Sequence, residues 1–286
     1  MSQSIAEAIL EATKVLHAAG LSEPRREAAS LLANVLHQDR TFLITRAEAS
    51  LTADALATFH RHLRRRAGGE PLQYITGYQE FFGLRFEVNP DALIPRPETE
   101  LLVESALDLI PDGASPLICD LGTGTGCIAI SLLHERPLVR AIAVEISTAA
   151  VCLAVRNAAR HEVIERIGFV VADGFEAFPE QPVFDLIVSN PPYIADLDWA
   201  RLQREVRDHE PRTALTSGSE GLTMIRRLIK EAPAFLVDGG YLVIEMGYNQ
   251  REAVEEMIDP RIWKLSTIRN DLQGIPRTVV LQKRGS

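Results

Sequence analysis

The sequence predicts an α/β protein in which a small helical domain and a β-hairpin precede a Rossmann-like, mostly parallel sheet of seven strands. From residue 94 onward, short apolar runs alternate with helical patterns, as they do where helices cover both faces of a parallel sheet. A glycine-rich turn joins the first of these runs to a helix. The first seventy residues show helical periodicity and no strand signal. We therefore predict a helical domain over 1–70, a hairpin connector over 71–93 and the sheet domain over 94–286, and a chain of 286 residues is long enough for two domains.

The helical domain should contain three main helices. Apolar side chains recur at helical spacing from Ile5 until Gly20 ends the pattern, Ser22 is placed to cap a second helix, and a third begins near Thr52. A short turn over 41–45 fills the gap between the last two. The apolar stripes predict a core within this domain, with a leftover face for a protein partner.

Residues 73–88 mix aromatic and β-branched side chains with glycines, which is typical of a β-hairpin. A helix over 98–110 should follow, with Pro97 at its first position, where proline is well tolerated. If this helix entry folds over a ligand site, Arg96 and Glu98 line the substrate channel.

The glycine-rich turn follows the apolar run 117–121 and precedes a helix that begins near Cys127. Its residues are Gly122, Thr123, Gly124, Thr125 and Gly126. Glycines let a backbone approach a ligand closely, and a helix N-terminus offers unpaired N–H groups. The turn therefore predicts a nucleotide-like cofactor, but its spacing departs from the G-x-G-x-x-G pattern and argues against NAD.

Acidic residues follow the next two predicted strands. Glu145 ends the run 140–144, roughly 20 residues after the glycines, where a carboxylate can accept both hydroxyls of a ribose. Asp173 and Gly174 follow the run 167–171, and Asp173 is placed to accept from an adenine amine. Open α/β sheets bind ligands at the carboxyl ends of their strands, so these residues should share one site.

The fourth strand, 184–189, ends in Asn190-Pro191-Pro192-Tyr193. An amide or exocyclic amine nitrogen is a poor nucleophile, because its lone pair is delocalised. The Asn190 side-chain oxygen and the Pro191 carbonyl can each accept one N–H of such a group and hold it in line with a methyl donor. Two prolines make the turn stiff, and Tyr193 offers a flat face for the acceptor.

The rest of the chain completes the sheet. Residues 194–221 form a long polar stretch of the kind that often acts as a lid, with a short helix over 199–207. Helices are expected over 222–234 and 250–258, and strands over 240–245, 263–268 and 278–283, the last two joined by a turn at 271–274. We expect one strand to be antiparallel, at the edge of the sheet.

Composition favours a soluble, cytoplasmic enzyme. The net charge of −9 and the pI near 5.4 argue against a surface that neutralises phosphates, and the basic run 64–66 is interpreted as a solvated helix end. Cys119, Cys127 and Cys152 form no metal or redox pair, and we interpret them as buried thiols in a reducing compartment. No metal site, signal peptide or membrane-spanning run is predicted.

Taken together, these motifs resemble the class I S-adenosylmethionine-dependent methyltransferases, and within them the release-factor glutamine N5-methyltransferases. The resemblance covers nearly the whole chain. Besides the motifs above it is carried by the segments 94–100 and 210–215, and its discriminating piece is Pro-Arg-Pro-Glu-Thr-Glu at 95–100. It implies S-adenosylmethionine as cofactor, S-adenosylhomocysteine as product, and the glutamine of the Gly-Gly-Gln loop of peptide chain release factors as substrate. It also implies that the helical domain helps to grip the release factor. Some members carry an aromatic residue beside adenine where this chain has Gly174. In this chain Gly174 would contact the cofactor through its backbone, and Phe175 is the candidate substitute for the aromatic residue.

Three alternatives remain open. A nucleic-acid adenine-N6 methyltransferase shares the Asn-Pro-Pro-Tyr turn but needs a basic groove. A glutamine methyltransferase of a ribosomal protein shares the chemistry and most motifs. A binding module without turnover is disfavoured, because the glycine-rich turn, Glu145 and the Asn190 turn are all intact.

Overall fold

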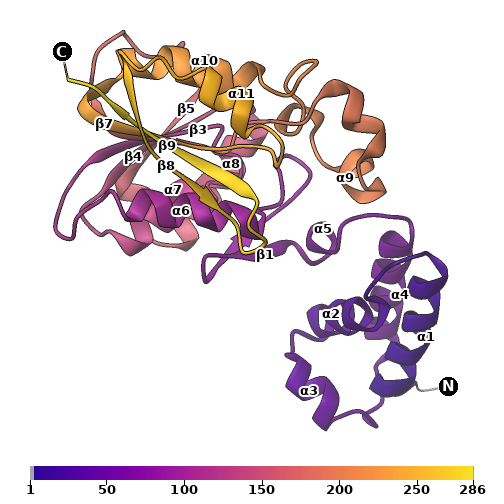
Figure 1. The fold of residues 1–286 in the computed structure, drawn as a ribbon. Coiled ribbons are helices and arrows are strands. Elements are labelled where there is room, and N and C mark those ends of the chain that lie inside the picture. Colours follow the sequence, from indigo (N-terminus) through magenta and orange to yellow (C-terminus); the bar gives the residue numbers. More distant parts are fainter. Residues whose placement is uncertain (1–2, 286) are drawn as a thin grey trace. The chain divides into compact units, whose positions relative to one another are not determined.

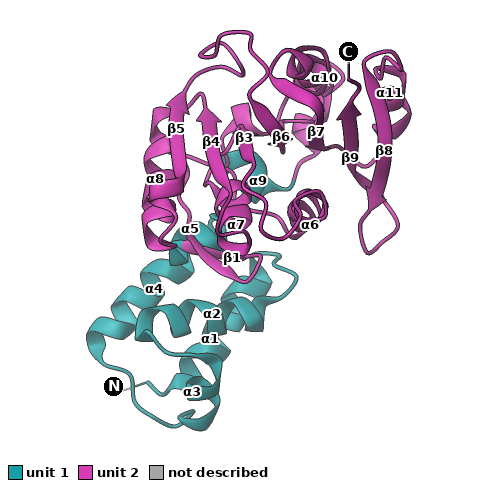
Figure 2. Ribbon diagram, turned by 90° about the vertical axis from the view of Figure 1, so that its left-hand side faces the viewer, with its two compact units in different colours: residues 1–77, 203–209 teal, residues 78–202, 210–286 magenta. Residues whose placement is uncertain are grey.

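The structure is a computed structural model that describes residues 3–285, so residues 1, 2 and 286 of the predicted domains lie outside it. It divides into two compact units (Figure 2). The helical unit comprises Met1–Gly77 and Gln203–His209, and the sheet unit comprises Tyr78–Leu202 and Glu210–Ser286. The hairpin therefore belongs to the sheet unit, and a short piece of the long polar stretch belongs to the helical unit.

In its described residues the helical unit contains α1 (Ile5–Ala18), α2 (Pro24–Leu36), α3 (Arg40–Thr45), α4 (Ala53–Ala67), α5 (Leu72–Thr76) and α9 (Arg204–His209). Ser4 caps α1 in a reciprocal pair with Glu7. Helix α4 begins at Ala53, which confirms a helix start near Thr52, and the Thr52 side chain caps it. The predicted cap at Ser22 is wrong: α2 begins at Pro24, and no side chain caps it.

A buried arginine holds α4 and α9 within the helical unit. Arg66 bonds to the Glu27 carboxylate and donates to the Glu70 carbonyl at 3.0 Å, and it forms an ion pair with Glu205 of α9 at 2.8 Å. Its side chain is only 7% exposed, so the interpretation of residues 64–66 as a solvated helix end is wrong for Arg66. An arginine flanked by two carboxylates satisfies the charge that burial would otherwise penalise.

The hairpin consists of β1 (Tyr78–Phe81) and β2 (Leu84–Glu87), paired antiparallel. Extended structure begins at Tyr78 rather than at residue 73, because 72–76 form helix α5 and Gly77 ends that helix at a φ of 82°.

The sheet contains β3 (Leu117–Leu121), β4 (Arg140–Glu145), β5 (Ile167–Val171), β6 (Phe184–Ser189), β7 (Leu236–Glu245), β8 (Trp263–Asn270) and β9 (Pro276–Lys283). Its order is β5-β4-β3-β6-β7-β9-β8, which confirms the seven-stranded, mostly parallel sheet. The predicted position of the antiparallel strand at the edge of the sheet is wrong. The antiparallel strand is β9, which lies between β7 and β8 and is antiparallel to both.

Helices cover both faces of the sheet (Figure 1). Those that pack on one face are α6 (Glu100–Leu107), α7 (Cys127–Glu135) and α8 (Thr148–Arg160), and those on the other are α10 (Thr223–Glu231) and α11 (Arg251–Glu256). Short 3₁₀ turns occupy Pro97–Thr99, Ile164–Arg166, Asp196–Arg201, Arg212–Ala214 and Ala232–Ala234. Alternate residues of each central strand enter the two cores, for example Val188 on the α6 and α7 face and Ile187 on the other.

The order of the strands places the functional residues. From β3 the chain proceeds outward to β4 and β5, and then crosses back to β6 on the other side of β3. Such a reversal leaves a crevice at the carboxyl ends of the two central strands. The glycine-rich turn and Asn190 follow these two strands directly.

Two further predictions from the sequence concern the burial of the cysteines and the absence of a membrane-spanning helix. Cys119 and Cys127 are buried, but Cys152 is exposed, so the prediction of three buried thiols is wrong for Cys152. Burial raises the pKa of the Cys127 thiol to about 12, so the thiol stays protonated. Within residues 3–285 no helix combines the length and apolar character needed to cross a bilayer.

Candidate functional site

A cavity of about 500 Å³ opens at the carboxyl ends of β3 to β6. Its volume lies within the range of small-molecule sites, roughly 300–1,000 Å³. The predicted residues that line it are Arg96, Gly122, Thr123, Gly124, Thr125, Glu145, Asp173, Gly174, Asn190 and Pro192. One cavity therefore brings together residues from four strand ends and from the segment before α6.

The glycine-rich turn leaves room for a ligand on one side and packs tightly on the other. Gly122 and Gly124 have φ angles of +74° and +55°, and a Cβ added at Gly122 would meet no atom within 4 Å. At Gly126, with φ +82°, an added Cβ would lie 2.8 Å from Ile130 Cδ1. The first two glycines thus keep the cavity wall bare, and the third allows α7 to start close beneath it.

Asp120 fixes the start of α7 from below the turn. Its Oδ2 accepts hydrogen bonds from the Thr123 hydroxyl at 2.7 Å and from the Ala129 N–H at 3.2 Å, so the carboxylate caps the helix. Burial raises the pKa of the Asp120 carboxyl to about 6 against these hydrogen bonds. Because the Thr123 hydroxyl points to Asp120, Thr123 offers its backbone to the cavity.

Glu145 is held by the backbone on both carboxylate oxygens. The Gly124 N–H donates to one oxygen and the Ser147 N–H to the other, each at 3.0 Å. A carboxylate has about four acceptor sites, so two stay available to hydroxyl groups in the cavity. The geometry suits the two adjacent hydroxyls of a ribose.

Asp173 is positioned by an arginine that the sequence did not single out. Arg227 of α10 donates to the Asp173 carboxylate at 2.6 Å and to its backbone carbonyl at 3.1 Å. The guanidinium also fills the space beside Gly174, where an added Cβ would lie 3.0 Å from it. Phe175 points away into the core, stacked on Phe235 with ring centroids 4.3 Å apart. Gly174 therefore lines the cavity, and Phe175 cannot replace a missing aromatic there.

The turn after β6 divides between the cavity and the protein interior. Asn190 and Pro192 line the cavity, whereas Pro191 is buried. The Asn190 amide NH2 donates to the Thr99 hydroxyl at 3.0 Å, which turns the amide oxygen away from Thr99. Tyr193 donates its hydroxyl to Glu245 at 3.1 Å, and its carbonyl accepts from Gln250 at 2.9 Å.

Arg96 reaches the cavity but is not a free cation. Its guanidinium bonds to the Glu210 carboxylate, whose side chain is 1% exposed and also accepts from the Ile94 N–H at 3.3 Å. The ion pair between Arg96 and Glu210 thus connects the second half of the long polar stretch 194–221 to the segment before α6. Glu98, predicted beside Arg96, is exposed and does not line this cavity.

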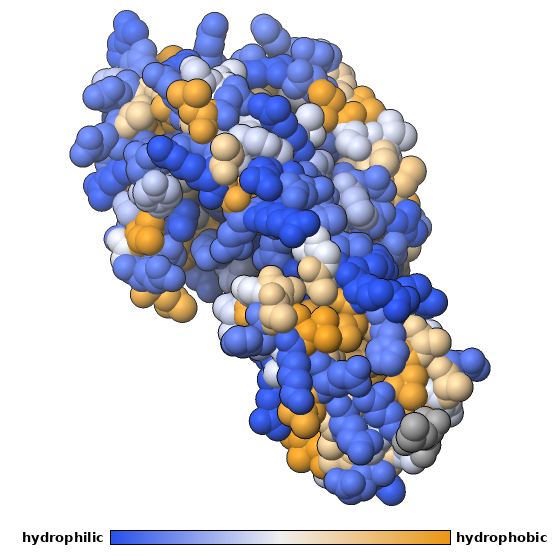
Figure 3. Space-filling model, turned by 90° about the vertical axis from the view of Figure 1, so that its right-hand side faces the viewer, coloured by the Kyte–Doolittle hydropathy of each residue, from blue (hydrophilic) through white to orange (hydrophobic). Residues whose placement is uncertain are grey.

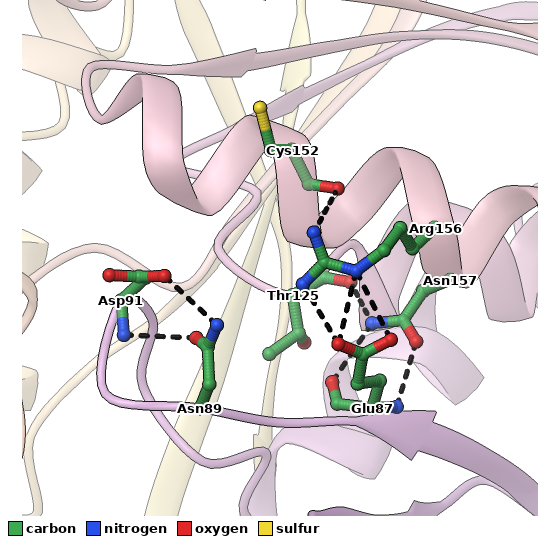
Figure 4. Close-up of polar contacts among 7 residues, drawn as sticks. All are labelled: Glu87, Asn89, Asp91, Thr125, Cys152, Arg156 and Asn157. Carbon is green, nitrogen blue, oxygen red and sulfur yellow. Dashed lines mark hydrogen bonds and ion pairs between the residues drawn. The ribbon is translucent and has the colours of Figure 1, made fainter.

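The hairpin is attached to the cavity wall by a buried asparagine of α8 (Figure 4). The Asn157 NH2 donates to the carbonyls of Thr125 and Glu87 at 2.9 and 3.0 Å, and its oxygen accepts from the Glu87 N–H at 2.8 Å. Arg156 adds an ion pair with the Glu87 carboxylate at 2.8 Å. Asn157 thus holds the last strand of the hairpin against the glycine-rich turn.

Several lining residues were not predicted, among them Ala92, Thr99, Ile146, Ala172, Thr213 and Met224. Ile146 follows Glu145 directly and is 62% exposed, so its place after a ligand-binding acid was a usable signal. Thr99 lies inside the segment 94–100, but nothing local shows that it contacts Asn190. Among the described residues, no group of three metal-ligating side chains occurs.

Two protein-family models match the chain. The PrmC N-terminal domain matches residues 7–77, and the methyltransferase small domain matches residues 97–209. The first match ends at the boundary of the helical unit, and the second covers the glycine-rich turn and the Asn190 turn.

Curated relatives match over almost their whole length. The chain is 42% identical to the release factor glutamine methyltransferase of Koribacter versatilis, over 98% of this chain and 99% of that protein. It is 46% identical to the protein of the same name from Burkholderia pseudomallei, over 88% and 89% of the two chains. Among solved structures, a methyltransferase from Pyrococcus furiosus has the same fold, with a TM-score of 0.54, 16% identity and coverage of 82% of this chain and all of that one.

Proposed function

Because this chain belongs to the release factor glutamine methyltransferases, we propose that it transfers a methyl group to the side-chain amide nitrogen of the glutamine in the Gly-Gly-Gln motif of peptide chain release factors. One observation carries the proposal. The Asn190 side chain lines the same cavity as the glycine-rich turn and Glu145, so a cofactor and an amide acceptor would meet there.

The cavity fits S-adenosylmethionine, and a methyltransferase domain implies a cofactor of this type. Gly122 and Gly124 leave the wall open to its methionine end, Glu145 has two acceptor sites for its ribose, and Asp173 has acceptor capacity for its adenine amine. Ile146 and Met224 supply apolar surface to the same cavity. S-Adenosylmethionine would supply an electrophilic methyl group and leave as S-adenosylhomocysteine.

The protein's part in the reaction is to orient the acceptor amide. Its NH2 has two N–H donors, and the Asn190 oxygen and the Pro191 carbonyl would accept one each. This fixes the nitrogen for in-line attack and stabilises the positive charge that develops as the new N–C bond forms and the C–S bond breaks. The nitrogen then loses one proton to solvent, so no strong base is required.

The helical unit is the part of the protein that we propose binds the release factor. On the face drawn in Figure 3, hydrophobic side chains gather over the helical unit, in the lower part of the view. Leu10 and Ile44 of this unit are 59% and 77% exposed. Contiguous apolar patches, rather than single exposed side chains, are the feature that marks protein-binding surfaces.

The test is transfer of tritiated methyl from S-adenosylmethionine to four substrates in parallel: purified release factor, its variant with Gly-Gly-Ala in place of Gly-Gly-Gln, ribosomal protein, and DNA. We expect label on the unaltered release factor alone. Label on ribosomal protein or on DNA would contradict the proposed substrate, and no label on any of the four would contradict methyl transfer itself.

A further inference from the structure

A fully buried carboxyl group lies behind Asn190 with no role in binding the ligands proposed above. Glu245 ends β7, and it directly follows Ile244, which pairs with Ser189 of β6. Asn190 and Glu245 are thus neighbouring strand-end residues. Because side chains alternate across a sheet, both point to the face covered by α6, the helix that directly follows Thr99.

Thr99 lies where a 3₁₀ turn runs into α6. It is the last residue of the turn Pro97–Thr99, has helical φ and ψ angles of −70° and −18°, and makes no capping hydrogen bond with its side chain. The hydroxyl instead accepts from the Asn190 NH2, and its residue is 2% exposed. The Thr99 hydroxyl is therefore engaged by Asn190 and not by the helix backbone.

The hydroxyl proton of Thr99 then needs an acceptor, and the buried carboxylate that interacts with this hydroxyl is Glu245. Interaction with the Thr99 hydroxyl stabilises the ionised form of the Glu245 carboxyl, while its Oε2 has no hydrogen-bond partner among the described residues. The other oxygen, Oε1, accepts from Tyr193. A carboxylate is an acceptor only, so both hydroxyls must point their protons toward it.

We propose that Glu245 is a positioning residue that acts through the Thr99 hydroxyl to set which end of the Asn190 amide faces the cavity. This rests on the proposed function, in which the acceptor nitrogen brings two N–H donors. With Glu245 ionised, the Thr99 proton points to Glu245, the Asn190 NH2 donates to Thr99, and the Asn190 oxygen faces the acceptor. With a hydrogen-bond donor at position 245, the Thr99 hydroxyl donates its proton to the Asn190 amide oxygen instead. The Asn190 amide then turns over, so its NH2 group faces the two N–H groups of the substrate amide.

The charge of Glu245 therefore sets the active orientation. Burial raises the pKa of the Glu245 carboxyl to about 7. The hydroxyls of Thr99 and Tyr193 and the charge of Arg277 in β9 oppose this rise, and the charge of Glu98 adds to it. Cys127, which also interacts with Glu245, stays protonated, as does Tyr193, whose pKa is raised far above its usual value by burial and by Glu245. Turnover should fall as the pH drops through about 7.

The experiment compares four variants with the unaltered enzyme: Glu245→Gln, Thr99→Val, the double variant, and Thr99→Ser, which keeps the hydroxyl. Thr278→Val is the matched control, because Thr278 pairs with Glu245 across the strands and its buried hydroxyl has no hydrogen-bond partner. Turnover on release factor is measured from pH 5.5 to 8.5, and cofactor binding is measured by calorimetry. The Asn190 side-chain amide signals of isotope-labelled protein are recorded by NMR.

We expect Glu245→Gln and Thr99→Val each to lower kcat at least about tenfold, the scale of effect that misplacement of a positioning group produces. Cofactor affinity should be unchanged, and the double variant should be no worse than either single one. Thr99→Ser should restore most of the turnover lost in Thr99→Val. Glu245→Gln should lose the fall in activity near pH 7, and the Asn190 amide signals should shift in both single variants but not in Thr278→Val.

Additive losses in the double variant, or unshifted Asn190 signals in Glu245→Gln, would overturn the inference. A loss of cofactor affinity equal to the loss of kcat would also overturn it, because it would show general damage to the cavity. The amide signals separate this result from failure of the proposed function: if the unaltered enzyme methylates nothing, the signals still show whether Glu245 orients Asn190. If it methylates release factor but the signals do not respond, only the inference fails.

Discussion

Four carboxyl groups lie near the carboxyl edge of the sheet, and each has a different environment. Asp120 is buried and caps α7, Glu145 is held by two backbone N–H groups, and Asp173 is paired with Arg227. Glu245 is buried beneath two hydroxyls. The same functional group can thus stabilise a helix, bind a ligand or orient a neighbour, and the surroundings determine which.

At the same scale, Asn190→Ala should separate chemistry from cofactor binding. The substitution removes the amide oxygen that is proposed to orient the acceptor, so we expect kcat to fall about 100-fold or more. The affinity for S-adenosylmethionine should change less than about fivefold, the equivalent of one hydrogen bond. Steady-state kinetics and calorimetry measure the two quantities, and equal losses in both would contradict the assigned role.

The buried charge of Glu245 should also lower the stability of the protein at high pH. Its pKa is raised from 4.5 to about 7, so the folded state retains a proton that the unfolded state has released, and stability falls as the pH rises through this window. Glu245→Gln cannot ionise. Its Tm should therefore exceed that of the unaltered protein by roughly 3 °C or more at pH 8, and the difference should shrink by pH 5. A difference that stays constant between the two pH values would contradict the buried charge.

At the scale of elements, the sequence was sufficient where the signal was local. The ends of β3 to β6 and the residues that follow them were predicted, because apolar runs, glycines and acids lie next to one another in the chain. The position of β9 between β7 and β8 was not, since strand order depends on long-range pairing. Residues 73–76 were predicted as part of the hairpin because Tyr74 and Ile75 favour strands, but both are buried and the segment Leu72–Thr76 is helical. Thr99, Arg227 and Glu245 were missed as site residues for the same reason as β9: their partners lie far away in sequence.

Helix α8 offers a paired test of how the cavity wall is supported. Asn157→Ala would remove the partner of three backbone groups: the Thr125 carbonyl in a buried contact, and the Glu87 N–H and carbonyl in partly buried contacts. We expect a loss of about 3 kcal/mol or more in the free energy of unfolding, and weaker cofactor binding because the glycine-rich turn loses its support. Cys152→Ala on the same helix removes an exposed side chain and should change stability by less than about 0.5 kcal/mol. Denaturant unfolding and calorimetry measure both, and similar effects in the two variants would refute this account.

At the scale of the whole molecule, substrate grip and chemistry are assigned to different units. Ile44 of the helical unit is 77% exposed, so Ile44→Asp should raise the KM for release factor at least about fivefold while the kcat at saturation and the cofactor affinity stay unchanged. Leu272→Asp, at the fully exposed tip of the β8–β9 hairpin in the sheet unit, is the matched control and should leave KM unchanged. If the control raises KM and Ile44→Asp does not, the grip lies on the sheet unit.

The chain passes between the two units three times, after Gly77, after Leu202 and after His209. The helical unit is therefore not encoded by one continuous stretch of the gene. Recombination that exchanged only its first 77 residues would leave the original α9 in the rest of the chain. Glu205 of α9 would then have to pair with whatever residue the new sequence carries at the position of Arg66. A lineage can thus acquire a new recognition module only together with compensating changes in the loop that follows the Asn190 turn, and the two halves of this enzyme must evolve together.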